Sequence, residues 1–453
     1  MTVCFTPGEV LEATEGQLIS PAITEFFEGV STDTRTLGPG SLFVALSGER
    51  FDGHAFIPEA IRKGATGLVV SCRPAEVLPG ITVFLVPDTR TAYQDLARFH
   101  RCRFILPVIA ITGSNGKTST KDMIAAVLST RLKVLKTEAN FNNAIGLSQT
   151  LLKITAAHQA VVVEMGMRGL GEIAGLAAIA LPTIGVVTNV GETHLERLGS
   201  IDNIAAAKAE LIEALDGEGV AVLNGDDVNV RAMRGKTDAR IVLFGLATEC
   251  AVKAVNLKQS PQGAAFDCMT ETLSFPVVLP MPGIHNVYNA LAAIAVGLEL
   301  GLEPQDIVRG LAQYEPGKMR LDIRRYGDIT VIDDTYNASP LSMAAAIDVL
   351  ASVAKGRKLA AIGDMLELGT ASWEAHAKVG RHLAAIGVEV VLTIGEMARV
   401  AGEAAKQQGV PVVIACPDHD SAISDLRRLL QPGDTLLLKG SRGMTMEKLL
   451  AVF

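Results

Sequence analysis

Residues 108–120 have the sequence Val-Ile-Ala-Ile-Thr-Gly-Ser-Asn-Gly-Lys-Thr-Ser-Thr, and the rest of the chain is best interpreted outward from them. The apolar run at 108–111 predicts a buried strand that ends at a glycine-containing turn. A helical pattern begins at about Thr118 and continues through Met123, Ile124 and Val127. Strand, turn and helix N-terminus together predict a phosphate-binding loop, because backbone N–H groups and the positive end of the helix dipole point at one place.

Two side chains of this loop suit a nucleotide. Lys117 adds a full positive charge, and Thr118 is placed to offer its hydroxyl to the Mg²⁺ of a bound nucleotide. The spacing is unusual, since two residues separate the loop glycines where the common pattern has four. The predicted nucleotide contacts of the loop are Gly113, Ser114, Asn115, Gly116, Lys117, Thr118 and Ser119.

Composition limits the class of protein. A chain of 453 residues is too long for one ordinary core, and its 49% hydrophobic and 20% charged residues are typical of a folded globular protein. The net charge of −8 argues against a nucleic-acid partner but allows an anionic substrate in a locally basic pocket. The acidic N-terminus lacks a signal-peptide pattern, and the longest apolar region, 173–187, is too short to span a bilayer. We therefore expect a cytoplasmic protein without membrane insertion, with six scattered cysteines as buried, reduced thiols: Cys4, Cys72, Cys102, Cys250, Cys268 and Cys416.

Strands and helices alternate along the chain, which predicts an α/β fold of three domains with parallel sheets. Residues 1–104 form a small N-terminal α/β unit, and residues 105–316 a central unit around the phosphate loop. Pro316-Gly317 marks a linker to a doubly wound, Rossmann-like unit at 317–453. Residues 250–280 lack a helical period and predict an antiparallel flap.

Polar side chains follow two strands near the phosphate loop. Glu164 ends one predicted strand, and His194 lies in the turn after another. Each alone is more typical of an ordinary capping or polar residue, but two strand ends meeting at one nucleotide predict a second divalent cation beside the γ-phosphate.

Lys208 lies on an amphipathic helix, where a lysine normally faces solvent. Three further polar stretches, 333–337, 363–369 and 439–442, follow strands of the C-terminal unit and predict one polar rim, unless they are ordinary loops.

Two polar stretches of the N-terminal unit are also candidates. Residues 31–35, Ser-Thr-Asp-Thr-Arg, suit a phosphate or uridine edge, whereas the plainer alternative is a capped loop with a surface arginine. Residues 50–54, Arg-Phe-Asp-Gly-His, are the second stretch.

Taken together these motifs resemble the Mur ligase family, ATP-dependent enzymes that form amide bonds in peptidoglycan precursor synthesis. The resemblance extends over essentially the whole chain and includes a shortened phosphate loop at 112–118 and motifs at 140–146, 164–166, 194–196 and 283–290. Within the family, the motifs at 333–338, 363–369 and 439–442 are similar to those of the member that adds the last amino acids. The Asp-Asn-Pro-Arg motif of the member that adds the third residue does not occur in this chain.

The resemblance implies a UDP-substrate domain, an ATPase domain and a domain for the incoming dipeptide. It implies an enzyme that uses ATP and two Mg²⁺ ions to join UDP-N-acetylmuramoyl-tripeptide to D-alanyl-D-alanine through an acyl phosphate. We expect a monomer, although the sequence leaves the oligomeric state open. The third residue of the tripeptide, meso-diaminopimelate or L-lysine, stays open. The implied nucleotide contacts outside the loop are Asn286, Arg320 and Asp334, although the basic residue after Pro316-Gly317 is shifted from the common pattern. The implied substrate contacts are Ser31, Thr34 and Arg35 for UDP, with Asn142, Asn337, Ser441 and Arg442.

The resemblance also assigns the catalytic and metal-binding residues. Lys117, His194 and Lys208 are the expected catalytic residues, and Thr118, Glu164, His194 and Lys208 the expected metal ligands. Lys208 corresponds to a lysine that this family carries as an N-carbamate. The carbamate supplies oxygens to a hard cation, but its formation needs a neutral amine, and an ordinary lysine has a pKa of about 10.4.

Two alternatives stay open at this point. A phosphate-loop switch or motor would bind a nucleotide without ligation, but gives no role to residues 31–35. Folylpolyglutamate synthase is a nearer alternative, although it lacks a comparable N-terminal nucleotide-sugar domain.

Overall fold

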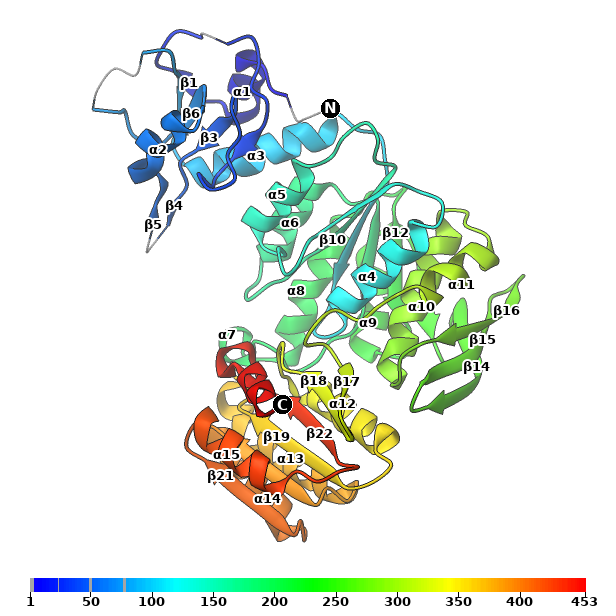
Figure 1. The fold of residues 1–453 in the computed structure, drawn as a ribbon. Helices are drawn as coiled ribbons and strands as arrows, with labels where there is room; N and C mark the ends of the chain where they lie inside the picture. The colour runs from blue at the N-terminus through cyan, green and yellow to red at the C-terminus, as the bar shows by residue number, and fades with distance from the viewer. Residues whose placement is uncertain (1–3, 23, 49–50, 76–78) are drawn as a thin grey trace.

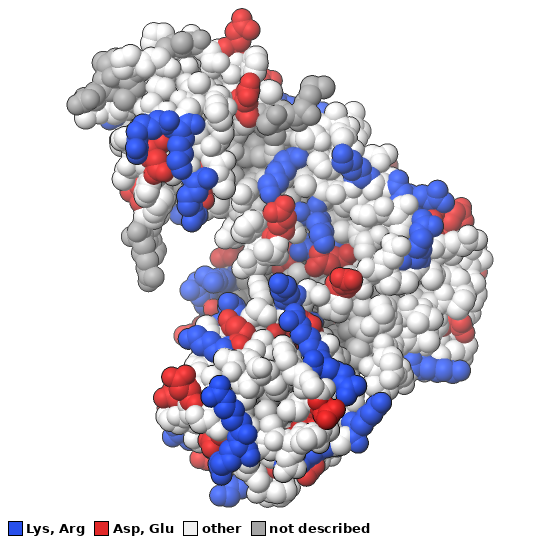
Figure 2. All heavy atoms as spheres, in the orientation of Figure 1, with Lys and Arg blue, Asp and Glu red and all other residues white. Residues whose placement is uncertain are grey.

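The computed structural model describes residues 4–22, 24–48, 51–75 and 79–453. Three α/β units follow one another along the chain, each built on its own sheet (Figure 1). The N-terminal and C-terminal units project to the same side of the central unit, so the molecule is bent around an open hollow (Figures 1 and 2). This arrangement confirms the predicted three-unit α/β fold, whereas the exact domain boundaries stay predictions. Arg50, part of the candidate stretch 50–54, lies outside the described residues.

The N-terminal unit has a five-stranded sheet in the order β1-β7-β6-β3-β2, parallel except for β1. Its core is continuous with that of the central unit, because α3 packs against two central helices, α5 (Ala144–Leu151) and α6 (Glu172–Ala180). Within that contact the buried Arg101 side chain donates a hydrogen bond of 3.1 Å to the carbonyl of Ala180. The sheet strands are β1 (Gln17–Leu18), β2 (Val30–Ser31), β3 (Leu42–Val44), β6 (Gly67–Val70) and β7 (Thr82–Leu85). The other elements are α1 (Pro7–Thr14), β4 (Ser47–Gly48), β5 (Phe51–Asp52), η1 (Gly53–Phe56), α2 (Ile57–Arg62) and α3 (Thr89–Cys102).

The central unit is built on a nine-stranded sheet in the order β16-β15-β14-β13-β12-β11-β8-β10-β9. Strand β8 is fully buried, and its side chains alternate between two cores: Val108 and Ala110 face one, Ile109 and Ile111 the other. The strands are β8 (Val108–Thr112), β9 (Val134–Lys136), β10 (Ala160–Glu164), β11 (Ile184–Val187), β12 (Val220–Asn224), β13 (Arg240–Gly245), β14 (Val252–Ser260), β15 (Gly263–Met269) and β16 (Ser274–Leu279).

Helices cover both faces of this sheet. The apolar residues of α4, α10 and α11 belong to one core, and those of α5, α6 and α8 to the other. The helices are α4 (Lys117–Leu128), α5 (Ala144–Leu151), α6 (Glu172–Ala180), α7 (Leu195–Leu198), α8 (Ile201–Glu213), α9 (Val228–Ala232), α10 (Ile284–Glu299) and α11 (Pro304–Ala312).

Residues 250–280 do not form a separate flap. They are antiparallel, as predicted, but β14 pairs in parallel with β13, so the three strands extend the central sheet. Their alternating buried and exposed residues explain this placement, because one face of β15 and β16 packs into the core beneath α10 and α11.

The C-terminal unit has a six-stranded sheet in the order β17-β18-β22-β19-β20-β21, parallel except for the β17–β18 hairpin. The sequence analysis missed α15, which makes the crossover that the parallel strands β21 and β22 need. The strands are β17 (Asp322–Tyr326), β18 (Ile329–Asp334), β19 (Lys358–Gly363), β20 (Val390–Ile394), β21 (Val412–Cys416) and β22 (Thr435–Lys439). The helices are α12 (Pro340–Val353), η3 (Gly369–Ala371), α13 (Ser372–Ala385), α14 (Glu396–Gln407) and α15 (His419–Leu429).

The expectation that all six cysteines are buried is wrong. Cys250, Cys268 and Cys416 are buried, but Cys4, Cys72 and Cys102 are exposed, because they lie near the end of the chain, in a loop and at the end of α3. None of the helices in the described part of the chain has the length and apolar character to cross a bilayer.

Candidate functional site

A cavity of 1260 Å³ lies where the carboxyl ends of the central strands face the C-terminal unit. Open α/β sheets bind ligands at this edge. The cavity brings together most of the predicted site residues, although they are far apart in the sequence. Those that line it are Gly113, Ser114, Asn115, Gly116, Lys117, Thr118, Ser119, Asn142, Glu164, His194, Lys208, Asn286, Arg320, Asp334, Asn337, Ser441 and Arg442.

The phosphate loop follows β8 and contacts the residues that come directly after β11. Gly113 and Gly116 have φ of 149° and 80°, and a Cβ on Gly113 would lie 1.9 Å from Thr188 Oγ1. Asn189 fixes the loop backbone, because its Oδ1 accepts from Asn115 N at 2.8 Å and its Nδ2 donates to Asn115 O at 3.0 Å. The loop is therefore preformed for an anion.

Lys117 begins α4, one residue earlier than the predicted start. Its Nζ donates to the loop carbonyls of Gly113 at 2.7 Å and Ser114 at 3.3 Å. Burial lowers the pKa of this ammonium, while the Glu164 charge raises it. The Lys117 ammonium can exchange these carbonyl partners for the oxygens of a phosphate without losing a salt bridge.

Thr118 and Glu164 meet beside the loop. Thr118 Oγ1 donates to Glu164 Oε2 at 2.7 Å, and Asn142 Nδ2 donates to Glu164 Oε1 at 2.9 Å. The buried Lys121 places its Nζ 4.0 Å from Glu164 Oε2. Glu164 is thus an anchored carboxylate next to a hydroxyl, both of them hard oxygen donors.

His194 lies at the N-terminal end of α7 with a left-handed backbone, φ 57°. Its Nδ1 contacts Glu367 Oε2 of the C-terminal unit. Burial lowers the pKa of His194, whereas the hydrogen bond to Glu367 raises it.

Lys208 is not a surface lysine. The residue is only 2% exposed, on the face of α8 that packs onto the sheet, and no described residue makes a hydrogen bond or ion pair with its Nζ. Burial, and then the charge of Lys117, lower the pKa of Lys208 well below its ordinary value. Both effects favour the neutral amine over the ammonium, and the neutral amine is the form from which a carbamate would be made.

Asn286 lies on the first turn of α10, which begins at Ile284. Its Nδ2 donates to the Pro282 carbonyl at 2.8 Å, and its Oδ1 accepts from Asn289 Nδ2 at 3.3 Å. Asn289 in turn accepts from Thr120 of α4 at 3.1 Å, which connects α10 to the phosphate-loop helix.

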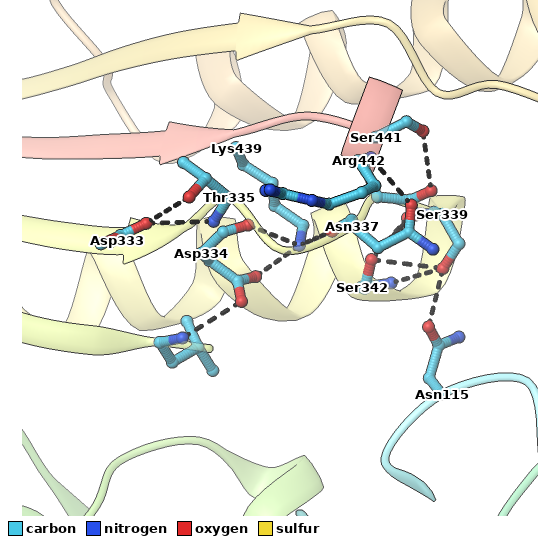
Figure 3. A network of polar contacts seen from close by, with 12 residues as sticks. Asn115, Asp333, Asp334, Thr335, Asn337, Ser339, Ser342, Lys439, Ser441 and Arg442 are labelled. Carbon is cyan, nitrogen blue, oxygen red and sulfur yellow. Dashed lines mark hydrogen bonds and ion pairs between the residues drawn. The ribbon is translucent and has the colours of Figure 1, made fainter. Parts of the chain in front are cut away.

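The C-terminal unit supplies a polar rim from the ends of β18 and β22 (Figure 3). Lys439, 1% exposed, pairs with Asp334 and donates to the Asn337 carbonyl at 2.9 Å. Ser441 Oγ accepts from Leu366 N at 2.9 Å, and Asn337 Oδ1 accepts from Arg442 N at 3.4 Å. The three predicted stretches 333–337, 363–369 and 439–442 are therefore one hydrogen-bonded unit.

The linker between the central and C-terminal units holds Arg320 over an aromatic ring. Its guanidinium carbon lies 3.8 Å from the centre of the Tyr336 ring. Both neighbours of Arg320, Met319 and Leu321, have positive φ of 64° and 50°, and Leu321 N donates to Asp334 Oδ1 at 3.1 Å.

The predicted UDP contacts lie apart from this cavity. Arg35 is exposed and pairs with Asp33 at 2.7 Å, an ion pair that lowers the pKa of Asp33. Thr34 is only 7% exposed, and Ser31 Oγ accepts from Asp33 N at 3.2 Å. Among the described residues of the N-terminal unit, Arg90 lines the cavity.

Sequence reasoning missed three residues of the site. Asn189 lies two residues after the end of β11, so the strand-end rule applied to it, although it was given no role. Glu367 lies in a stretch that was predicted only as part of a rim. Ser339 Oγ of the C-terminal unit donates to Asn115 Oδ1 of the central unit at 2.9 Å, and no short stretch of sequence predicts such a contact.

The described residues contain no group of three or more His, Cys, Asp and Glu side chains that could hold a metal ion. The oxygens of Thr118 and Glu164 nevertheless suit Mg²⁺, which takes few protein ligands and shares nucleotide phosphates. The buried Lys208 Nζ, which has no hydrogen-bond or ion-pair partner in the described part of the chain, would suit a carbamate.

Three family models match the chain. They are the Mur ligase middle domain at residues 111–297, the Mur ligase glutamate ligase domain at 319–442, and the Mur ligase family catalytic domain at 27–101.

Curated relatives match over nearly the full length. UDP-N-acetylmuramoyl-tripeptide–D-alanyl-D-alanine ligase of Synechocystis is 42% identical over 93% of this chain and 92% of its own. The protein of the same name from Bacillus subtilis is 37% identical over 98% of this chain and 97% of its own.

Solved structures agree with these matches. A crystal structure of MurF from Acinetobacter baumannii has a TM-score of 0.92 and 35% identity, covering 99% of this chain and 98% of that one. MurF from Thermotoga maritima, in complex with ADP, has a TM-score of 0.84 and 28% identity over 94% and 96%. Folylpolyglutamate synthase of Mycobacterium tuberculosis, at 18% identity and a TM-score of 0.64 over 80% and 94%, shares the fold alone.

Proposed function

This chain belongs to the Mur ligase family, and we propose that it joins D-alanyl-D-alanine to UDP-N-acetylmuramoyl-tripeptide at the expense of ATP. The product is the pentapeptide precursor of peptidoglycan. One observation carries the proposal: a single cavity is lined both by an anion-ready phosphate loop and by the polar rim of the C-terminal unit. A nucleotide phosphate and an incoming amine can therefore meet at one place.

The chemistry follows from the substrates. A carboxylate is a poor electrophile, so the tripeptide carboxylate first attacks the γ-phosphoryl group, which gives an acyl phosphate and ADP. The dipeptide amine then attacks the acyl carbon, phosphate leaves and the amide forms. The protein must mainly position the groups and stabilise crowded negative charge.

Lys117 is assigned to the transferring phosphoryl group, because its ammonium lies in the loop with only carbonyl partners. Thr118, Glu164 and His194 would hold two Mg²⁺ ions, which supply positive charge to the phosphates when bound. Lys208, as an N-carbamate, would be a further ligand. Its burial and its lowered pKa support this assignment.

The remaining assignments concern contacts with the tripeptide substrate, the nucleotide and the dipeptide. Ser31, Thr34 and Arg35 are proposed for the UDP moiety, and Asn142 for the peptide arm. Asn286, Arg320 and Asp334 are proposed for the nucleotide, and Asn337, Ser441 and Arg442 for the dipeptide, since they line the same cavity. We propose a monomer in the cytoplasm.

The test is an incubation of the protein and ATP with D-alanyl-D-alanine and either tripeptide nucleotide, ending in meso-diaminopimelate or in L-lysine. A parallel reaction contains folate and glutamate, and mass spectrometry detects the products. A pentapeptide nucleotide is expected. ATP hydrolysis without any amide product would favour a nucleotide switch, and a folate product the alternative ligase.

A further inference from the structure

Glu367 of the C-terminal unit contacts the central unit at His194. The carboxylate atom Oε2 meets His194 Nδ1, and the Glu367 carbonyl accepts from Glu196 N at 3.2 Å. Gly369 of the same loop packs against the backbone of Glu196. This two-point contact joins the loop after β19 to the first turn of α7, which are distant in the sequence.

Both residues are held in an unusual backbone conformation. His194 has φ of 57° and Glu367 φ of 62°, and neither is a glycine. Such conformations cost free energy and persist only where the surroundings fix them. Here they direct the imidazole and the carboxylate at each other.

The loop that carries Glu367 is rigidly anchored in its own unit. Leu366 N donates to Ser441 Oγ at 2.9 Å, and Met365 N donates to His376 Nε2 at 2.9 Å. His376 is buried, and its other ring nitrogen donates to the Ser372 carbonyl at 2.7 Å. These hydrogen bonds fix the position of Glu367 relative to the C-terminal unit.

We propose that Glu367 is a positioning residue that orients His194. The ability of His194 to bind a metal ion then depends on closure of the C-terminal unit over the central unit. This inference rests on the proposed function. A carboxylate that accepts from Nδ1–H fixes the tautomer and leaves Nε2, which contacts no described hydrogen-bond partner, for the cation. Because the orienting group belongs to a different unit, closure strengthens cation binding, and by linkage cation binding favours closure.

A purely structural role fits the contact less well. The side chains of His194 and Glu367 are 27% and 38% exposed, and an ion pair so accessible to solvent contributes little to stability. A polar contact of this kind next to the phosphate loop instead suits a residue that acts on a ligand of the cavity.

The test measures binding of Mn²⁺, a spectroscopic substitute for Mg²⁺, by electron paramagnetic resonance on the full chain with a non-hydrolysable ATP analogue. Glu367→Gln keeps the size of the side chain but removes its charge. We expect the weaker of two Mn²⁺ sites to lose affinity about tenfold or more, and the stronger site to be unchanged. Glu374→Gln is the matched control, because Glu374 is an exposed glutamate near the same loop that pairs with Arg381 at 2.6 Å. It should bind both ions as the original chain does.

The His194→Ala variant and the double variant complete the cycle. If Glu367 acts through His194, Glu367→Gln should weaken Mn²⁺ binding no further in the His194→Ala background. Unchanged Mn²⁺ binding in Glu367→Gln overturns the proposal, and so does additivity of the two losses, which would mark Glu367 as an independent ligand. The ligation assay on the original chain tests the proposed function separately, so the two failures can be told apart.

Discussion

Ser339 of the C-terminal unit donates a hydrogen bond of 2.9 Å from its hydroxyl to Oδ1 of Asn115, inside the phosphate loop (Figure 3). Ser339 is also the N-cap of α12, since its hydroxyl accepts from Ser342 N at 3.3 Å. One hydroxyl therefore caps a helix of one unit and contacts the nucleotide loop of another. The position of the C-terminal unit is thereby connected to the loop that would hold the phosphates.

The first prediction concerns closure of the C-terminal unit over the central unit. Residues 316–317 are expected to act as a hinge, so small-angle scattering should show compaction when an ATP analogue and both substrates are added. Ser339→Ala should reduce the compaction, whereas Ser342→Ala, which changes the same helix cap but not the Asn115 contact, should not. Each cap variant should lose about 1 kcal/mol of stability. An unchanged scattering profile of the original chain would count against closure.

The second prediction concerns Lys117. Lys117→Ala should lower kcat for ligation at least about a thousandfold, because a preorganised charge on the transferring phosphoryl group is lost. Circular dichroism should show an intact fold. Lys133→Ala, an exposed lysine of the same unit, should leave turnover unchanged. An active Lys117→Ala enzyme would refute the assignment.

The third prediction concerns the N-terminal unit. Arg35→Ala should weaken binding of the UDP substrate in calorimetry and leave ATP binding unchanged, because Arg35 is exposed and does not line the cavity. The control is Arg98→Ala, an exposed arginine on α3. If both ligands bind more weakly to Arg35→Ala, the variant is misfolded and the prediction is wrong.

The fourth prediction concerns the carbamate on Lys208. Protein equilibrated with ¹³C-labelled bicarbonate should show a carbamate carbon resonance, which Lys208→Ala abolishes. Lys208→Ala should also lose ligation severely and keep most ATP binding, while Lys236→Ala, an exposed lysine, should keep both. A bare amine at Lys208 in a high-resolution map of the metal-bound, active enzyme would contradict the carbamate.

The fifth prediction concerns acid sensitivity. Both ring nitrogens of His285 are buried and have no hydrogen-bond partner among the described residues, and burial lowers the pKa of this group to about 4. The unfolded chain binds this proton near pH 6.5, so the contribution to stability is present above that pH and is lost as the pH falls toward 4. At pH 5 the loss should be about 1–2 kcal/mol.

Thermal unfolding at pH 7.5 and pH 5 measures this loss. His285→Gln, which cannot titrate, should show a smaller decrease in stability between the two values than the original chain. An equal decrease in both proteins would assign the acid sensitivity to other groups.

The sequence by itself determined the local elements and the order of the units. The apolar run 108–111 followed by a glycine turn sufficed for the strand, the loop and α4, because hydrophobic period and turn chemistry are local properties. The strand-end rule also placed Glu164 and His194 together, and both line the cavity, since parallel strands finish at one edge of a sheet. Where local signals were weak, as in the polar helix α15, the sequence analysis failed.

Only the tertiary structure decided which residues face each other. Lys208 looks like a solvent-facing lysine in its own helix and becomes buried because that face of α8 packs onto the sheet. Glu367 and His194 are 173 residues apart, and their contact depends on how two units dock. Docking is set by the sum of many weak contacts over a surface, and such a sum leaves no pattern in any short stretch of the chain.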